Sequence, residues 1–200
     1  MLKFQEQVLK HDLDRLPPRS RVAFAASCAQ RLADVYHRFL ANSGRNDRSA
    51  ACDAALDYAW THILTSPEVA TTDRLLAEVM ALIPDQDAPG WTPLTAYAED
   101  ALSALAYCLQ CLQSADAQEA AWAARRVYEA LDYFVTSRDN ISPSEPGAEM
   151  RVLGDSVIQA ELERQARDIA DLSSAGDSLL RELLDNLRQR SAAEQAITIA

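Results

Sequence analysis

Apolar residues recur at every third or fourth position along almost the whole chain, which is the period of an amphipathic helix. Proline and glycine residues separate the periodic stretches. Alternation with a period of two, as in a strand, is confined to the closing segment AITIA. The pattern predicts helices over residues 4–16, 22–43, 49–64, 75–80, 93–114, 117–138 and 148–172, with further leucines at 179–187.

The fold class that follows is all-α: a single-domain helical bundle of about seven to eight helices with no significant sheet, over residues 1–200. A long C-terminal helical segment is expected from about residue 148. Whether the segment SSAGD at 173–177 divides it into two helices is left open. Two helix starts are well marked. Thr92 precedes Pro93 as a cap and a first helical residue, and Asp116 and Glu119 have the separation of a capping box.

The only closely spaced cysteines, Cys108 and Cys111, lie well inside one predicted helix. A redox pair would favour a position near a helix N-terminus, and a zinc site would need two further ligands that the surrounding sequence does not offer. Cys108 instead falls on an apolar seam that runs from Leu94 to Leu112. We expect it to be a small buried residue of the core, and we expect no metal site and no cofactor.

Composition and charge narrow the class of protein. The chain is 48% hydrophobic, has no apolar run long enough to cross a membrane and begins without a signal-peptide pattern, so we expect a cytoplasmic protein with no membrane contact. The net charge is −11, and residues 51–100 carry nine acidic side chains against the single base Arg74. Such a surface repels nucleic acid and attracts a basic protein.

Catalytic motifs give little direction. The three histidines lie on three different predicted helices, and each is expected to be a partly exposed amphipathic residue. Asp34 and His37 have the spacing of an inward-facing pair in a di-iron bundle, but such sites need two Glu-x-x-His copies. The chain has no glycine-rich phosphate loop, no HExxH and no GxSxG.

Short segments spread along the chain resemble one bacterial family. These are FAASCAQR with Phe24, Ala26 and Arg31, LDYAW with Leu56, Asp57 and Trp60, IPD at Ile83, and AEDALSAL from Ala98. Together they resemble the YjaG family of all-helical cytosolic proteins of unknown function. The resemblance implies a helical fold and no established active site.

Two functions remain open. The first is a cytosolic protein-binding module with an acidic surface, for instance an immunity or inhibitor protein that neutralises a basic toxin enzyme. Trp91 beside Asp85 and Asp87 is its best anchor, although Trp91 could instead pack the following helix against the core. The second is an enzyme or small-ligand-binding bundle that uses Asp34, His37, Asp57 and Asp100. The residues expected to bind the partner are Asp53, Asp57, Asp85, Asp87, Trp91, Glu99 and Asp100.

Overall fold

The computed structural model describes residues 1–44, 49–85, 87, 90–175 and 180–197. About 77% of these residues are helical, and they include no β-strand, so the all-α prediction is confirmed. None of the helices in these ranges is long and apolar enough to span a membrane. The helices of the described part are α1 (Glu6–Asp14), α2 (Pro18–Ser43), α3 (Ser49–His62), α4 (Val69–Met80), α5 (Pro93–Ser114), α6 (Ala117–Arg138), α7 (Ala148–Leu153), α8 (Ser156–Ser174) and α9 (Leu180–Ala193).

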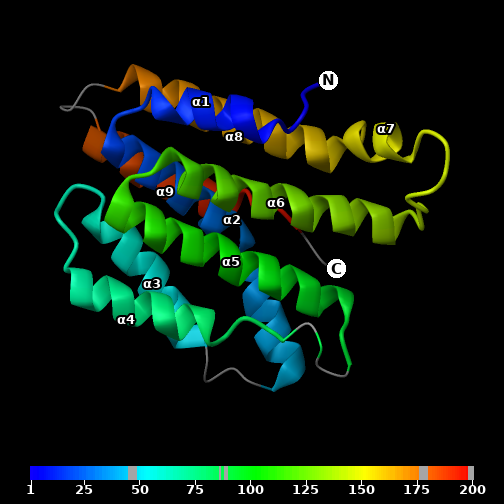
Figure 1. Ribbon diagram of the computed structural model, residues 1–200, viewed down its shortest axis with the longest axis horizontal. Coiled ribbons are helices and arrows are strands. Elements are labelled where there is room, and N and C mark those ends of the chain that lie inside the picture. The colour runs from blue at the N-terminus through cyan, green and yellow to red at the C-terminus, as the bar shows by residue number, and fades with distance from the viewer. Residues whose placement is uncertain (45–48, 86, 88–89, 176–179, 198–200) are drawn as a thin grey trace.

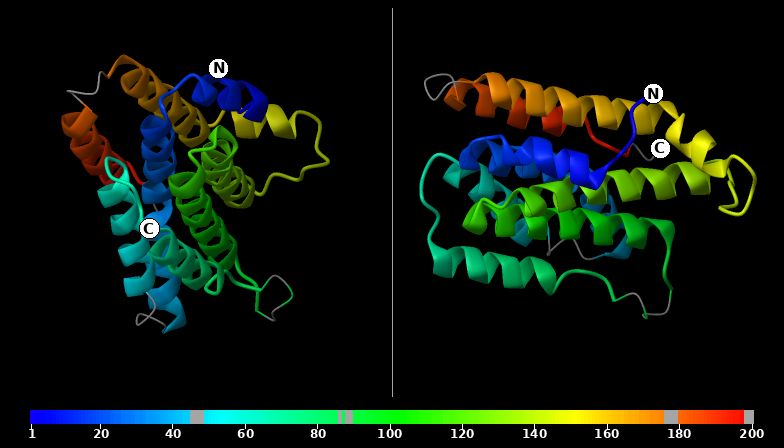
Figure 2. Two further views of the ribbon diagram at one scale, coloured as in Figure 1. Left: turned by 60° about the vertical axis from the view of Figure 1, so that its left-hand side comes forward. Right: turned by 45° about the horizontal axis from the view of Figure 1, so that its top comes forward.

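Helices α2, α5 and α6 form the centre of the bundle. α5 and α6 run antiparallel side by side, and α2 crosses behind them (Figure 1). α3 and α4 cover one side of this centre, while α1, α8 and α9 cover the other (Figure 2). α2 and α5 each bury residues over almost their full length, as expected for helices that other helices surround.

The predicted seam of α5 is buried. Cys108 and its neighbour Leu109 are fully buried, and the facing helix α6 places small residues such as Ala120 and Ala123 in the core. Alanines let two helix backbones approach closely, so α5 and α6 pack tightly. The prediction that Cys108 belongs to the core is confirmed, and Cys111 is buried as well.

α5 and α6 both begin after the predicted N-cap residues, Thr92 and Asp116. Thr92 caps α5 by accepting a hydrogen bond from the Thr95 backbone N–H, and the Thr95 side chain completes a capping box with the N–H of Thr92. Asp116 caps α6, but its carboxylate accepts from the N–H of Gln118. The expected box between Asp116 and Glu119 is therefore wrong, because the aspartate is satisfied two residues further on.

The segment expected to be one helix over residues 148–172 is two helices. α7 ends at Leu153 with Gly154 as its C-cap, and Asp155 caps α8 by accepting from the N–H of Val157. Glycine lowers helix propensity and aspartate is a strong N-cap, so the chain breaks there although the apolar period continues across it. α8 ends at Ser174 and α9 begins at Leu180, so the last two helices are separate. The described part thus holds more helices than the seven to eight expected.

The end of the chain packs without forming a strand as far as it is described. The backbone N–H of Ala196 donates to the carbonyl of Arg31 on α2, and Ile197 is buried. The rest of the AITIA segment, residues 198–200, lies outside the described residues.

Candidate functional site

Asp53 and Asp57, which were predicted to bind a partner, lie on α3 and pair with basic residues of the same chain. His37 on α2 lies 2.8 Å from Asp53, measured from Nε2 to Oδ1, and Arg188 on α9 donates to Asp57. All four side chains are exposed to solvent by about 40% or more. Water screens exposed pairs and each pair is weak, so a competing basic group could displace either base.

The acidic residues on α5 face a different neighbour. Arg126 on α6 donates to Asp100 at 3.3 Å, and both side chains are mostly buried. Burial raises the pKa of Asp100 to about 7, although the charge of Arg126 acts in the opposite direction. Glu99 is half-buried beside it.

The remaining predicted residues lie in the connection between α4 and α5. Asp85 and Asp87 are both exposed, and the Asp85 carboxylate accepts from the backbone N–H of Asp87 at 3.0 Å. Neither carboxylate forms an ion pair with any residue that the structure describes. Trp91 is 36% exposed. We call Asp85, Asp87 and Trp91 the docking loop; residues 86, 88 and 89 between them lie outside the described residues.

The residues predicted to bind the partner are thus distributed over three places. Asp53 and Asp57 face α2 and α9, Asp100 faces α6, and the docking loop joins α4 to α5. The four residues of the enzyme hypothesis are also held on different partners, because Asp34 pairs with Arg38 at 2.8 Å. Asp34 and His37 thus have separate partners, and His37 is partly exposed, as expected.

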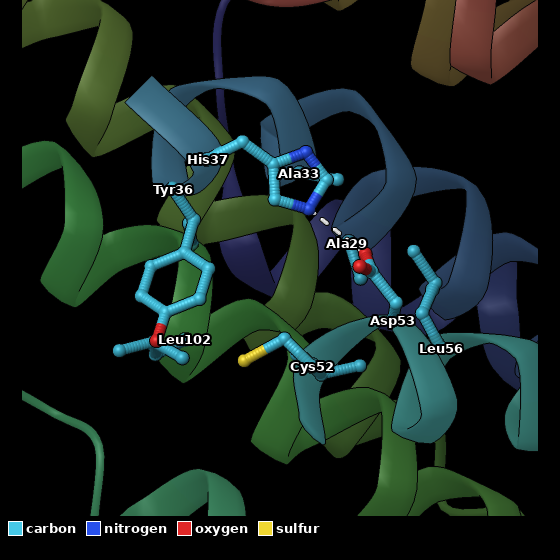
Figure 3. A pocket seen from close by; sticks show the side chains of 10 residues that line it. Ala29, Ala33, Tyr36, His37, Cys52, Asp53, Leu56 and Leu102 are labelled. Atoms are coloured by element: carbon cyan, nitrogen blue, oxygen red, sulfur yellow. Dashed lines mark hydrogen bonds and ion pairs between the residues drawn. The ribbon is translucent and has the colours of Figure 1, made fainter. Parts of the chain in front are cut away.

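A small pocket lies where α2, α3 and α5 meet (Figure 3). Its internal space is about 20 Å³, which is room for about one water molecule. His37 and Asp53 stand at its edge, and the wall is apolar. Burial raises the pKa of the Cys52 thiol in this wall to about 12, so the thiol is protonated at neutral pH and is a poor nucleophile.

Sequence analysis missed a buried ionic cluster between α2, α8 and α9. Arg31 is 1% exposed, and it donates to Glu161 at 3.1 Å and to Asp168 at 2.8 Å. Arg190 on α9 donates to the second oxygen of Asp168 at 2.7 Å, and Ser27 donates to the first at 3.0 Å.

One signal of this cluster was present in the sequence. Glu161, Gln165 and Asp168 follow one another at steps of four and three, so they share one face of α8. That face also carries the buried residues Ile158 and Leu172. Polar side chains that repeat on an apolar face indicate a buried polar network, because burial requires partners.

Residues 1–44, 49–85, 87, 90–175 and 180–197 contain no group of three or more His, Cys, Asp or Glu side chains that could bind a metal ion. Burial raises the pKa of Cys108 well above its usual value, and raises that of Cys111 to about 12. Both thiols are therefore neutral core groups.

The chain matches a known protein family and is similar in fold to a solved structure. The pattern of the family described as "Protein of unknown function (DUF416)" matches residues 8–199. The crystal structure of a DUF416 family protein from Shewanella baltica OS155 is similar with a TM-score of 0.81 and 18% sequence identity, over 96% of this chain and 97% of that chain. At this identity the likeness shows the fold alone. None of the curated proteins compared with the chain matches it.

Proposed function

The chain belongs to the DUF416 family of proteins of unknown function, and we propose that it works as a protein-binding module for a basic protein. The observation that carries the proposal is the docking loop. It combines an aromatic side chain that is 36% exposed with two carboxylates that have no basic partner among the described residues. Tryptophan is among the residues that most often anchor protein interfaces.

Charge supports a basic partner. Residues 51–100 contribute nine acidic side chains against Arg74, and the bases that pair with Asp53 and Asp57 come from α2 and α9. Long-range attraction from such a surface raises the association rate of a positively charged protein. Asp53, Asp57 and Glu99 would then guide the approach, while the docking loop makes the close contact. Asp100, mostly buried against Arg126, would add little to this attraction.

An immunity or inhibitor protein is the specific form of this proposal. It would cover a basic toxin enzyme with a complementary face and would need no catalytic group of its own. Its place of action would be the cytoplasm, where four buried free cysteines remain reduced. We also propose that the chain belongs to the narrower YjaG group.

The test is affinity capture from the native host, followed by mass spectrometry. We expect the wild-type chain to retain one basic protein, and the variant Asp85→Lys/Asp87→Lys to lose it. The matched control is Glu163→Lys/Asp185→Lys, which changes the net charge equally at two exposed residues of α8 and α9. Equal retention by wild type and both variants, or equal loss by both variants, would contradict the assignment to the docking loop.

A further inference from the structure

A groove of about 150 Å³ lies between the N-terminal segment with α1 on one wall and α8 on the other. The two helices run next to each other along one side of the bundle (Figures 1 and 2). Apolar side chains make up most of both walls, among them Phe4, Val8 and Leu9 opposite Leu162 and Ile169. An enclosed apolar cavity of about this volume holds a six-carbon molecule such as benzene. This groove is open to solvent on the side of Leu2 and Val8, which are both exposed.

Residues 2–5, a short strap of non-helical chain before α1, line one part of the groove. The side-chain amide of Gln159 accepts from the Leu2 N–H at 2.8 Å and donates to the Leu2 carbonyl at 2.9 Å. The ring of Phe4 stacks on Tyr128 of α6, with centroids 4.9 Å apart. These contacts hold the strap against α8 and α6.

The two ends of the groove differ in charge. Lys3 lines it at the strap, and Asp12 lines it near the end of α1. Lys3 lies in the strap before α1 begins at Glu6, and Asp12 lies in the last turn of α1. Neither side chain forms an ion pair with a described residue. A ligand whose charged end lies beside the strap meets the ammonium group of Lys3, which is exposed and has no anionic partner among the described residues.

We propose that this groove binds a small aliphatic carboxylate of about six carbons. The alkyl chain lies between α1 and α8, and the carboxylate pairs with Lys3. The site is separate from the docking loop, which joins α4 to α5, and the proposal does not depend on a protein partner.

Calorimetric titration of the whole protein with hexanoate, hexanol and hexylamine tests both halves of the proposal. We expect hexanoate to bind most tightly, hexanol more weakly and hexylamine most weakly. Methyl resonances of Leu9, Leu162 and Ile169 should shift on binding. Absence of hexanoate binding, shifts elsewhere only, or tighter binding of hexylamine would overturn the proposal.

Two variants sharpen the result. Ala166→Leu fills the groove and should abolish hexanoate binding, whereas the matched control Ala170→Leu, on an exposed part of α8 outside the groove, should retain it. Lys3→Ala should weaken hexanoate by about two- to fivefold, as for an exposed ion pair, and leave hexanol unchanged. Equal effects of the two leucine variants, or equal weakening of both ligands by Lys3→Ala, would contradict the assignment.

Discussion

Arg31 of α2 donates from Nη1 to Oδ2 of Asp168 on α8 across 2.8 Å, and both side chains are buried. The pair joins the centre of the bundle to its C-terminal helices. Removal of either partner should lower the free energy of unfolding, because the charge that remains is buried without this partner.

Asp168→Ala should therefore destabilise the protein by about 3–5 kcal/mol, because it leaves Arg31 and Arg190 without their shared carboxylate. Urea denaturation followed by circular dichroism measures the free energy of unfolding. As a control, Glu78→Ala removes the exposed partner of Arg74 and should cost less than about 1 kcal/mol. Similar losses in both variants would show that the buried cluster contributes no more than a surface pair.

Asp100 should make stability depend on pH. Its pKa is about 7 in the folded protein, above the value of 3.8 of an unperturbed aspartate, so the folded state favours the protonated form. The stabilisation is complete below about pH 4 and is lost as the pH rises towards 7. Asp100→Asn imitates the protonated form, so its free energy of unfolding relative to wild type should increase between pH 4 and pH 8 by at least about 1 kcal/mol.

Urea denaturation of Asp100→Asn and wild type at a series of pH values checks this dependence. Glu163→Gln, at an exposed position of α8, is the control and should show no comparable change. A difference between Asp100→Asn and wild type that stays constant from pH 4 to pH 8 would contradict a raised pKa at this residue.

Cys108 should react slowly with thiol reagents in the native protein, because it is fully buried. An added cysteine at the exposed residue Ser144 (Ser144→Cys) is the positive control and should be labelled rapidly. Rapid stoichiometric labelling of Cys108, or zinc bound in the purified protein, would overturn its assignment to packing. Cys108→Asp should cost several kcal/mol of stability, on the order of 2–7 kcal/mol, since it buries a polar group without a partner.

Substitution of two tryptophans separates docking from packing. Trp60 is 7% exposed and donates to Gln30, so Trp60→Ala should cost about 3–5 kcal/mol. Trp91 is 36% exposed, and Trp91→Ala should cost clearly less. Thermal and urea unfolding give both values. If Trp91→Ala were as destabilising as Trp60→Ala, Trp91 would serve mainly to pack α5 against the core.

The sequence predicted most helices because their apolar periods and caps are local signals. The seam of α5 and the Thr92 cap are examples, and both are present. The break at Gly154 was missed, because an apolar period continues through a short interruption. The pairing of His37 with Asp53 was missed too, since helix packing alone brings α2 beside α3.

The pairs of the buried ionic cluster could not be predicted either, because their residues lie far apart in the sequence. Arg31 and Asp168 are 137 positions apart, and no local pattern specifies that α8 lies against α2. The count of charges showed that residues 51–100 are acidic. It could not show that Asp53, Asp57 and Asp100 have basic partners within the chain. The two carboxylates of the docking loop have no such partner among the described residues, and Glu68 and Asp73 also form no ion pair there.

The most direct test of the proposed function is the binding of the captured basic protein, once purified, to wild type, Asp87→Lys and Trp91→Ala over a series of salt concentrations. The account predicts that Asp87→Lys slows association and weakens its dependence on salt, whereas Trp91→Ala speeds dissociation at every salt concentration. Unchanged rates and an unchanged salt dependence in both variants would contradict docking through this loop.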